Sequence, residues 1–317
     1  MRKLFGLFLL ALAFLAPDLA QAASRFAICA TTCTWDNSST AMWSASSGGA
    51  TGASAPVAGD DVTFDANTCT GGTTCTVTTF AGTISAATIT WGACTASTTG
   101  CIIDASVNNT NFTLSSNGGT TFNGSGTGTR QWKAGTGTYA LTSTNANGCF
   151  NMGTTTNSTG TVLSGATWSC SGATTSGRDW NGGGLSFGPT TFNTNSSNGT
   201  MRIVGANTFA SLTIGAPYYM TFGNGFTQTL TTGLTISGGS SSAIVVLSSS
   251  DNNQAATLSL GSAISPSWVA LRQITTSGGN ALTATNCFDL KGNTLASSGS
   301  CTAPTGGGGG GGRIIGG

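Results

Sequence analysis

The chain contains no histidine and no glutamate, and its nine acidic residues are all aspartate. Without histidine, the sequence excludes catalytic arrangements that use an imidazole base and metal sites with imidazole ligands. Without glutamate, it also excludes the bidentate ligand of an EF-hand and the usual general base of a metalloprotease. Most of the common catalytic and metal-binding motifs are therefore missing.

Charge is also scarce. Charged residues make up 6% of the chain, against about 25% in an ordinary soluble domain. The formal net charge is +1 and no basic block is present, so nucleic acid is not expected as a partner. The helix formers Lys, Gln and Glu are rare or absent, whereas Thr, β-branched and aromatic residues are plentiful. This composition predicts an all-β protein.

Residues 1–22 have the features of a secretory signal peptide. Met1-Arg2-Lys3 is a short basic start, Leu4 to Ala16 is an apolar run, and Ala20-Gln21-Ala22 is an A-x-A cleavage site. The alternative, a retained membrane anchor, is disfavoured because the apolar run is short for a membrane span. We expect a secreted or cell-surface protein (periplasmic or extracellular) that begins near Ala23 and has no membrane span after cleavage.

Ten cysteines indicate an oxidising compartment. Pairing sequence neighbours is the simplest of many connectivities. A zinc site is disfavoured because the chain has neither a C-x-x-C motif nor histidine. The closest pair is the least favourable, because four extended residues span about 13 Å. The neighbour pairs are Cys29–Cys33, Cys69–Cys75, Cys94–Cys101, Cys149–Cys170 and Cys287–Cys301.

One fixed spacing recurs through the second half of the chain. Apolar–Thr–apolar triplets such as Leu212-Thr213-Ile214 predict strands with Thr on one face and apolar residues on the other. A second, weaker register holds Phe222, Ile244 and Pro266, with Val246 and Trp268 offset from it by two positions. The main register places Cys170, Phe192, Ile214, Ile236 and Leu258 at equivalent positions.

A fixed period in this range is typical of a solenoid. The sequence predicts a right-handed parallel β-helix of about 22 residues per coil that rises about 4.8 Å per turn. Cys149 and Cys170, almost one coil apart, would then stack. A β-sandwich of irregular hairpins is the alternative. The expected organisation is a signal peptide (1–22), an N-terminal cap with Trp35 and Trp43 (23–66), a β-helix body (67–302, regular over about 168–277) and a disordered Gly-rich tail (303–317).

Three stretches carry a resemblance to known proteins. The first runs from Trp43-Ser44 through Ser47-Gly48-Gly49-Ala50 to Asp60-Asp61-Val62-Thr63-Phe64-Asp65. The other two are Gly205-Ala206-Asn207-Thr208-Phe209 with Leu212-Thr213-Ile214, and Phe226-Thr227-Gln228-Thr229-Leu230 with Leu234-Thr235-Ile236-Ser237-Gly238. Together they resemble Thr/Ser/Gly-rich parallel β-strand repeat proteins of bacterial secretomes and phage structural proteins. The resemblance implies architecture and supplies no catalytic residues to transfer.

Few residues are candidates for a functional site. Asp61 and Asp65 lie on one face of an expected strand and could hold Ca²⁺, although a turn that opens the strand is the simpler explanation. Trp180, Tyr218 and Tyr219 could stack on sugar rings, but large aromatics in such a chain are more often core. No catalytic residue, resident metal or cofactor is predicted.

The combined expectation is a secreted, non-catalytic β-helix with a structural or adhesin-like role. Its expected partners are glycans or further copies of itself. The alternatives are a carbohydrate-binding or polysaccharide-degrading β-helix protein, because fold analogy keeps an enzyme open, and a phage-derived fibre component.

Overall fold

The protein is all-β, and its described residues contain no helix. The structure is a computed structural model. It describes residues 22–70, 74–92, 101–115, 120–121, 130–142, 148–152, 160–171, 178–193, 200–215, 218–237, 239–296 and 298–304. The expected signal peptide up to residue 21, Cys94, and residues 305–317 of the expected tail lie outside these ranges.

Three sheets and one small strand pair account for the strands. Sheet A has, in spatial order, β27 (Phe288–Asp289), β24 (Val269–Arg272), β22 (Val245–Ser249), β20 (Tyr218–Phe222), β18 (Thr200–Val204), β15 (Arg178–Asn181), β13 (Phe150–Asn151), β10 (Thr120–Thr121), β7 (Thr88–Trp91), β4 (Asp61–Phe64), β1 (Ser24–Ala27) and β3 (Trp43–Ser44).

Sheet B has β25 (Ile274–Ser277), β23 (Ala256–Leu260), β21 (Thr227–Ser237), β19 (Thr208–Gly215), β17 (Thr190–Phe192), β14 (Thr167–Ser171), β12 (Thr138–Thr142), β9 (Asn111–Leu114) and β6 (Thr83–Ala86), with β16 (Ser186–Phe187) beside β19. Sheet C has β11 (Arg130–Lys133), β8 (Cys101–Asp104), β5 (Cys75–Thr79) and β2 (Thr32–Trp35). β26 (Thr283–Ala284) pairs with β28 (Ser300–Cys301).

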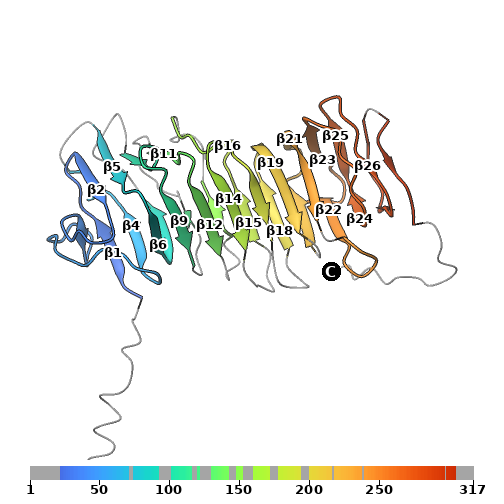
Figure 1. Cartoon of the computed structure of the whole chain (residues 1–317). Coiled ribbons are helices and arrows are strands. Elements are labelled where there is room, and N and C mark those ends of the chain that lie inside the picture. Colours follow the sequence, from blue (N-terminus) through green and yellow to red (C-terminus); the bar gives the residue numbers. More distant parts are fainter. Residues whose placement is uncertain are drawn as a thin grey trace, which may run out of the picture.

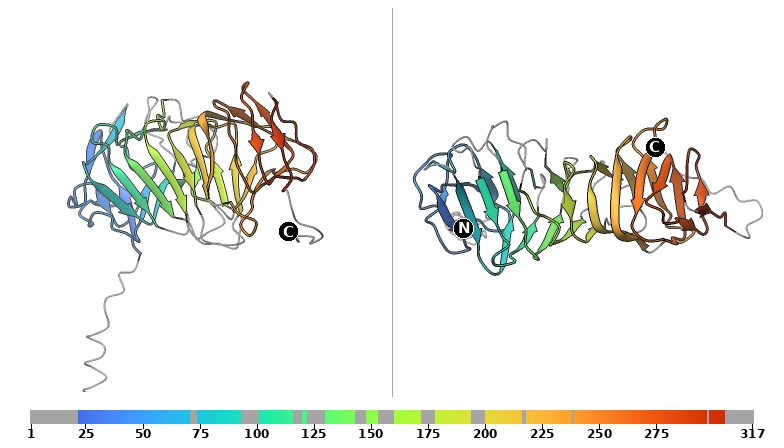
Figure 2. Two further views of the ribbon diagram at one scale, coloured as in Figure 1. Left: turned by 45° about the vertical axis from the view of Figure 1, so that its right-hand side comes forward. Right: turned by 90° about the horizontal axis from the view of Figure 1, so that it is seen from above.

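Neighbouring strands in a sheet are parallel and come from well-separated parts of the chain. Asp61 of β4 pairs with Thr88 of β7, for example, and Tyr139 of β12 pairs with Trp168 of β14. Among the named strand pairs of the described residues, only β1 with β3 is antiparallel. The strands follow one another along a long axis from the N-terminal to the C-terminal end (Figure 1), and the body stays elongated in other views (Figure 2). A sandwich of hairpins would instead require antiparallel neighbours throughout.

The main register is confirmed over three steps. Cys170 pairs with Phe192, Phe192 with Ile214, and Ile214 with Ile236. The fourth step is wrong, because Leu258 pairs with Gln228 and not with Ile236. The cause is the length of β21, whose first half lies against β23 while its second half continues the ladder from β19.

The second register is also wrong. Phe222 pairs with Ser249 rather than facing Ile244, and Val246 pairs with Ala270 rather than Trp268. Both steps are longer than the regular one, because segments such as that between β21 and β22 add length outside the strands. A loop that bulges from the body changes the spacing in sequence without changing the pairing in space.

The strands upstream of Trp168 pair at longer intervals than those of the main register. Phe112 pairs with Tyr139, and Phe150 pairs with Trp180. This region was expected to contain less regular coils of the same body. Many of its strands lie in the same sheets A and B as the regular steps, while β5, β8 and β11 form sheet C with β2.

The core lies between the sheets and follows the predicted alternation. In β19, Leu212 and Ile214 are buried while Thr213 between them is partly exposed. Aromatic rings stack along the interior of the N-terminal part, as in Phe64 on Trp91 and Tyr139 on Trp168, with ring centroids 4.8 and 4.3 Å apart. Further along the chain the core is mostly aliphatic, with Leu230, Leu247, Leu258, Leu271 and Leu282.

Four disulfides join described cysteines: Cys29–Cys33, Cys69–Cys75, Cys149–Cys170 and Cys287–Cys301. The first was the least favourable for an extended chain. A bend at residues 30–31 brings its Cα atoms to 5.8 Å. Such bonds persist in oxidising compartments.

Cys149 and Cys170 are joined, but they do not stack one coil apart. Cys170 lies in β14 of sheet B, whereas Cys149 directly precedes β13 of sheet A. Both are fully buried, with Cα atoms 5.9 Å apart. The nearby pairing steps, from Tyr139 to Trp168 and from Phe150 to Trp180, are longer than the stretch between the two cysteines. That stretch is therefore shorter than one pairing step, and the bond joins the sheet A side of the core to the sheet B side.

Candidate binding surface

The outer face of sheet A carries a row of polar side chains across five neighbouring strands. Pairing aligns Asp179 with Arg202, Arg202 with Thr221, Thr221 with Ser248, and Ser248 with Arg272. The residues on either side of Arg202, Met201 and Ile203, are buried in the core. The period-2 alternation of a strand therefore places the row on the outer side of the sheet, where Ser248 is nevertheless fully buried. We call Asp179, Arg202, Thr221, Ser248 and Arg272 the polar row.

At one end of the row Arg202 donates two hydrogen bonds to Asp179. Arg202 Nε and Nη2 donate to the two carboxylate oxygens at 2.9 and 2.6 Å. The hydrogen bond to Asp179 is the main reason that the pKa of Arg202 is raised above its ordinary value. Arg202 remains half exposed, at 52% of its side chain, so both groups face solvent while the pairing fixes their positions.

At the other end two side chains contact the phenol oxygen of Tyr219. Arg272 Nη2 donates to Tyr219 Oη at 2.6 Å, and Ser248 Oγ lies 3.3 Å from the same oxygen. Ser248 is buried, while Tyr219 and Arg272 are partly exposed. These contacts hold the ring of Tyr219 in one place on the sheet surface.

An apolar row runs beside the polar one. Thr200 pairs with Tyr219, Tyr219 with Val246, Val246 with Ala270, and Ala270 with Phe288. Tyr219, Val246 and Phe288 are partly exposed. The surface thus sets a stripe of apolar groups next to fixed hydrogen-bonding groups. A ligand with both apolar faces and hydroxyl edges would match it.

Two of the predicted sugar contacts are wrong. Trp180 is fully buried, and its ring stacks on Phe150 in the core with centroids 4.9 Å apart. Tyr218 is 3% exposed because it points inward from the first position of β20. Tyr219, the next residue, points outward for the same reason of alternation.

The aspartates proposed for Ca²⁺ take part in local contacts. Asp65 Oδ1 accepts from the backbone N of Asn67 at 2.8 Å, which is the hydrogen bond of an Asx turn. Asp61 Oδ1 accepts from Thr88 Oγ1 on the next strand at 2.5 Å. The Cα atoms of Asp61 and Asp65, four positions apart in nearly extended chain, are separated by about 13 Å. The part of the chain that the structure describes contains no group of three or more acidic, Cys or His side chains suited to a metal.

The outer face of sheet B differs from that of sheet A. Its central ladder runs through Ser85, Thr113, Ala140, Ser169, Thr191, Thr213 and Thr235. This ladder has neither a charged nor an aromatic side chain. It provides a regular hydroxyl surface for comparison with sheet A.

Most of this surface was not predicted from the sequence. The steps along the polar row, from Arg202 to Thr221, from Thr221 to Ser248 and on to Arg272, have no constant length. The only usable signal was Tyr219 in a strand of alternating character.

Among the described residues no helix is long and apolar enough to cross a membrane. Neither a family model nor a curated protein nor a solved structure matches this chain.

Proposed function

We propose that this protein is an exported, non-catalytic surface protein whose body is a right-handed parallel β-helix. The parallel pairing of strands from successive stretches of chain supports the helix, and crossovers between parallel strands of one sheet are almost always right-handed. Stacked backbone ladders around an apolar interior would make a stiff rod. Its role is structural or adhesin-like.

Export is supported by two observations. The A-x-A site after an apolar run precedes the first described strand, and four disulfides suit an oxidising compartment. The protein is then secreted or held at the cell surface.

We further propose that the partner is a glycan and that it binds to the outer face of sheet A. The observation that carries this proposal is the Tyr219 ring of the apolar row, which Arg272 and Ser248 of the polar row hold in place. Pyranose rings present an apolar face and hydroxyl edges. The Asp179–Arg202 pair and Arg272 offer charged hydrogen-bonding groups, which bind more strongly than neutral ones.

The test is a glycan array probed with the purified mature protein, with and without Ca²⁺. We expect binding that Ca²⁺ does not change. Tyr219→Ala and Arg202→Ala should each weaken it about tenfold or more, which corresponds to about 1.4 kcal/mol. Thr191→Ala and Thr213→Ala on the outer face of sheet B serve as matched controls and should leave binding unchanged.

Three outcomes would overturn the proposal in different ways. Equal weakening by the sheet B variants would move the contact to the hydroxyl ladder. Shortening of the bound glycan would favour an enzyme. If no glycan on the array binds and the protein assembles in a concentration-dependent way, a structural role through self-association would be favoured.

A further inference from the structure

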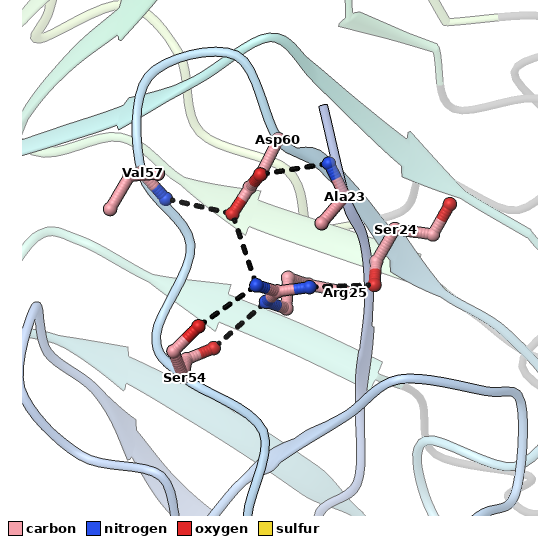
Figure 3. A network of polar contacts seen from close by, with 6 residues as sticks. All are labelled: Ala23, Ser24, Arg25, Ser54, Val57 and Asp60. Atoms are coloured by element: carbon pink, nitrogen blue, oxygen red, sulfur yellow. Dashed lines mark hydrogen bonds and ion pairs between the residues drawn. The ribbon is translucent and has the colours of Figure 1, made fainter. Parts of the chain in front are cut away.

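A buried carboxylate lies at the N-terminal end of the body. Asp60 is 4% exposed, and Figure 3 shows the groups around it. Asp60 Oδ1 accepts from the backbone N of Ala23 at 2.9 Å, and Oδ2 accepts from the backbone N of Val57 at 3.2 Å. The guanidinium of Arg25 lies 3.7 Å from Oδ2.

The strand register fixes Ala23 against this carboxylate. Ala23 directly precedes β1 and Asp60 directly precedes β4, and these two strands pair in parallel from Ser24 with Asp61. The backbone N of Asp61 also donates to the carbonyl of Ala23 at 3.0 Å. The nitrogen of Ala23 is therefore held in place beside Asp60.

The same nitrogen is the one that the leader cleavage would release. Ala20-Gln21-Ala22 is the A-x-A site, so hydrolysis after Ala22 makes Ala23 the first residue. Ala22 is exposed and Ala23 is partly buried. The bond to be cut thus lies at the border between accessible chain and the folded sheet.

We propose that Asp60 is a preformed binding site for the α-amino group of Ala23 that cleavage creates, so that processing strengthens the N-terminal end of the body. Water adds its oxygen to the carbonyl carbon of Ala22, the C–N bond breaks, and Ala22 leaves as a carboxylate. The nitrogen of Ala23 takes up protons and becomes an ammonium. The hydrogen bond from a neutral amide becomes one from a cation, and ionised donors give stronger bonds.

Arg25 leaves room for this second cation. Its Nε donates to the carbonyl of Ser54 at 3.0 Å, and its Nη2 donates to Ser54 Oγ at 2.8 Å. These bonds hold the guanidinium on the loop before β4, at ion-pair distance from Asp60 Oδ2 rather than on Oδ1. The oxygen that faces Ala23 stays available to the new ammonium.

The position of the contact explains what it would stabilise. β1 lies between β3 and β4 at the end of sheet A. β3 pairs only with Phe26 and Ala27, so Ser24 and Arg25 have a strand neighbour on one side only, in β4, and this start of β1 opens more easily than a strand in the middle of the sheet. Anchoring the first residue of the mature chain would hold β1 in this place after the leader is lost.

The test compares three forms of the chain to Gly317. One starts at Ala23 with a free amine, one starts at Ala23 with an acetylated amine, and one starts at Ala20. Acetyl-Ala23 keeps the amide N–H but not the charge, so it mimics the uncut bond. We expect the free-amine form to melt about 2–5 °C higher than the other two.

Variants show whether Asp60 is responsible. In Asp60→Asn the difference between free and acetylated forms should vanish, whatever the substitution itself costs. In Asp61→Asn, the exposed neighbour, the difference should remain. Equal melting of the free and acetylated wild-type forms would overturn the proposal, as would a difference that persists in Asp60→Asn.

The inference rests on the proposed export, and the two can fail separately. The mass of the exported protein should correspond to a chain that starts at Ala23, and a different start would overturn the assignment of this amine. A chain that is never exported would overturn the proposed function. The melting comparison uses purified proteins of defined start, so it decides the Asp60 pairing in either case.

Discussion

The N-terminal and C-terminal parts of the body differ in the number of residues between one paired position and the next. Between β4 and β15 the chain takes a long path from one paired position to the next, as from Cys75 to Cys101 and from Ile89 to Thr120. Near the C-terminal end the path is much shorter, as from Ala256 to Ile274 and from Ala270 to Phe288.

The cores of the two parts also differ in the kind of side chain that fills them. Rings fill the interior of the N-terminal part, where the stacked contacts run from Phe64 on Trp91 to Phe187 on Phe209. The C-terminal interior is filled mainly by Leu, Val and Ile. Because interiors are close-packed, removing a ring from the N-terminal part should leave a larger cavity than removing an aliphatic side chain from the C-terminal part.

The largest expected effect tests the inner and outer faces at the border of the two parts. Ile214 is fully buried and pairs with Phe192 and Ile236, while Thr213 is partly exposed. Ile214→Asp should cost about 4 kcal/mol or more, because it buries an unpaired charge. Thr213→Asp should cost far less. Denaturant unfolding measures both, and equal losses would contradict the assigned faces.

The next effect compares the two cores directly. Trp168→Ala in the aromatic part should cost about 3–5 kcal/mol, and Leu258→Ala in the aliphatic part should cost about 2–4 kcal/mol. Both side chains are fully buried, so the larger side chain leaves the larger cavity. Urea titration followed by circular dichroism gives the two values. A larger loss for the leucine variant would contradict the expectation that the loss follows the volume removed from the core.

Disulfide removal should have smaller effects that differ in extent. Replacing Cys149 and Cys170 with alanine should cost about 2–4 kcal/mol and loosen strands of sheets A and B together, since the bond joins the two sides. Replacing Cys287 and Cys301 should mainly loosen β26 to β28 at the end of the stack. Hydrogen exchange should show broad deprotection in the first variant and terminal deprotection in the second. The same pattern in both would contradict this difference.

The smallest effect comes from a residue outside both cores. Backbone hydrogen bonds from Ser39 and Ser38 lower the pKa of Asp36. The contribution of ionised Asp36 to the stability of the fold is therefore complete above the ordinary aspartate pKa of about 3.9. It is lost as the pH falls through the lowered value. Asp36→Asn should melt slightly below wild type at neutral pH, with the difference shrinking below about pH 4. A difference that grows in acid would contradict the direction of the shift.

Part of this fold was predictable because strands impose local rules. Alternation placed Leu212 and Ile214 inside and Thr213 outside, and the constant step aligned Phe192 with Ile214 and Ile214 with Ile236. The alignment failed at Leu258 because β23 pairs only with the first part of β21, up to Leu230, whereas β19 pairs along β21 as far as Ser237. Loops add residues between paired strands without changing which residues pair. A constant spacing in the sequence therefore cannot reveal the pairing where loop lengths differ.

The binding surface was harder to predict for the same reason. The step from Thr221 to Ser248 is longer than the step from Ser248 to Arg272, and both differ from the constant step. Residues that meet only through unequal steps leave no periodic signal. The rings of Trp180 and Tyr218 make them candidates for sugar contacts, but large apolar rings also suit the core, where both residues are buried.

A cross-linking measurement tests most directly that the number of residues between paired positions changes within one body. Thr227 pairs with Thr257, although a uniform step equal to that from Ile214 to Ile236 would align Thr257 with Thr235. Thr227→Cys with Thr257→Cys should form a disulfide during oxidative expression, because paired Cα atoms lie within bonding range. Thr235→Cys with Thr257→Cys should leave two free thiols. Peptide mapping under non-reducing conditions distinguishes them, and a link between positions 235 and 257 in place of 227 and 257 would contradict the account.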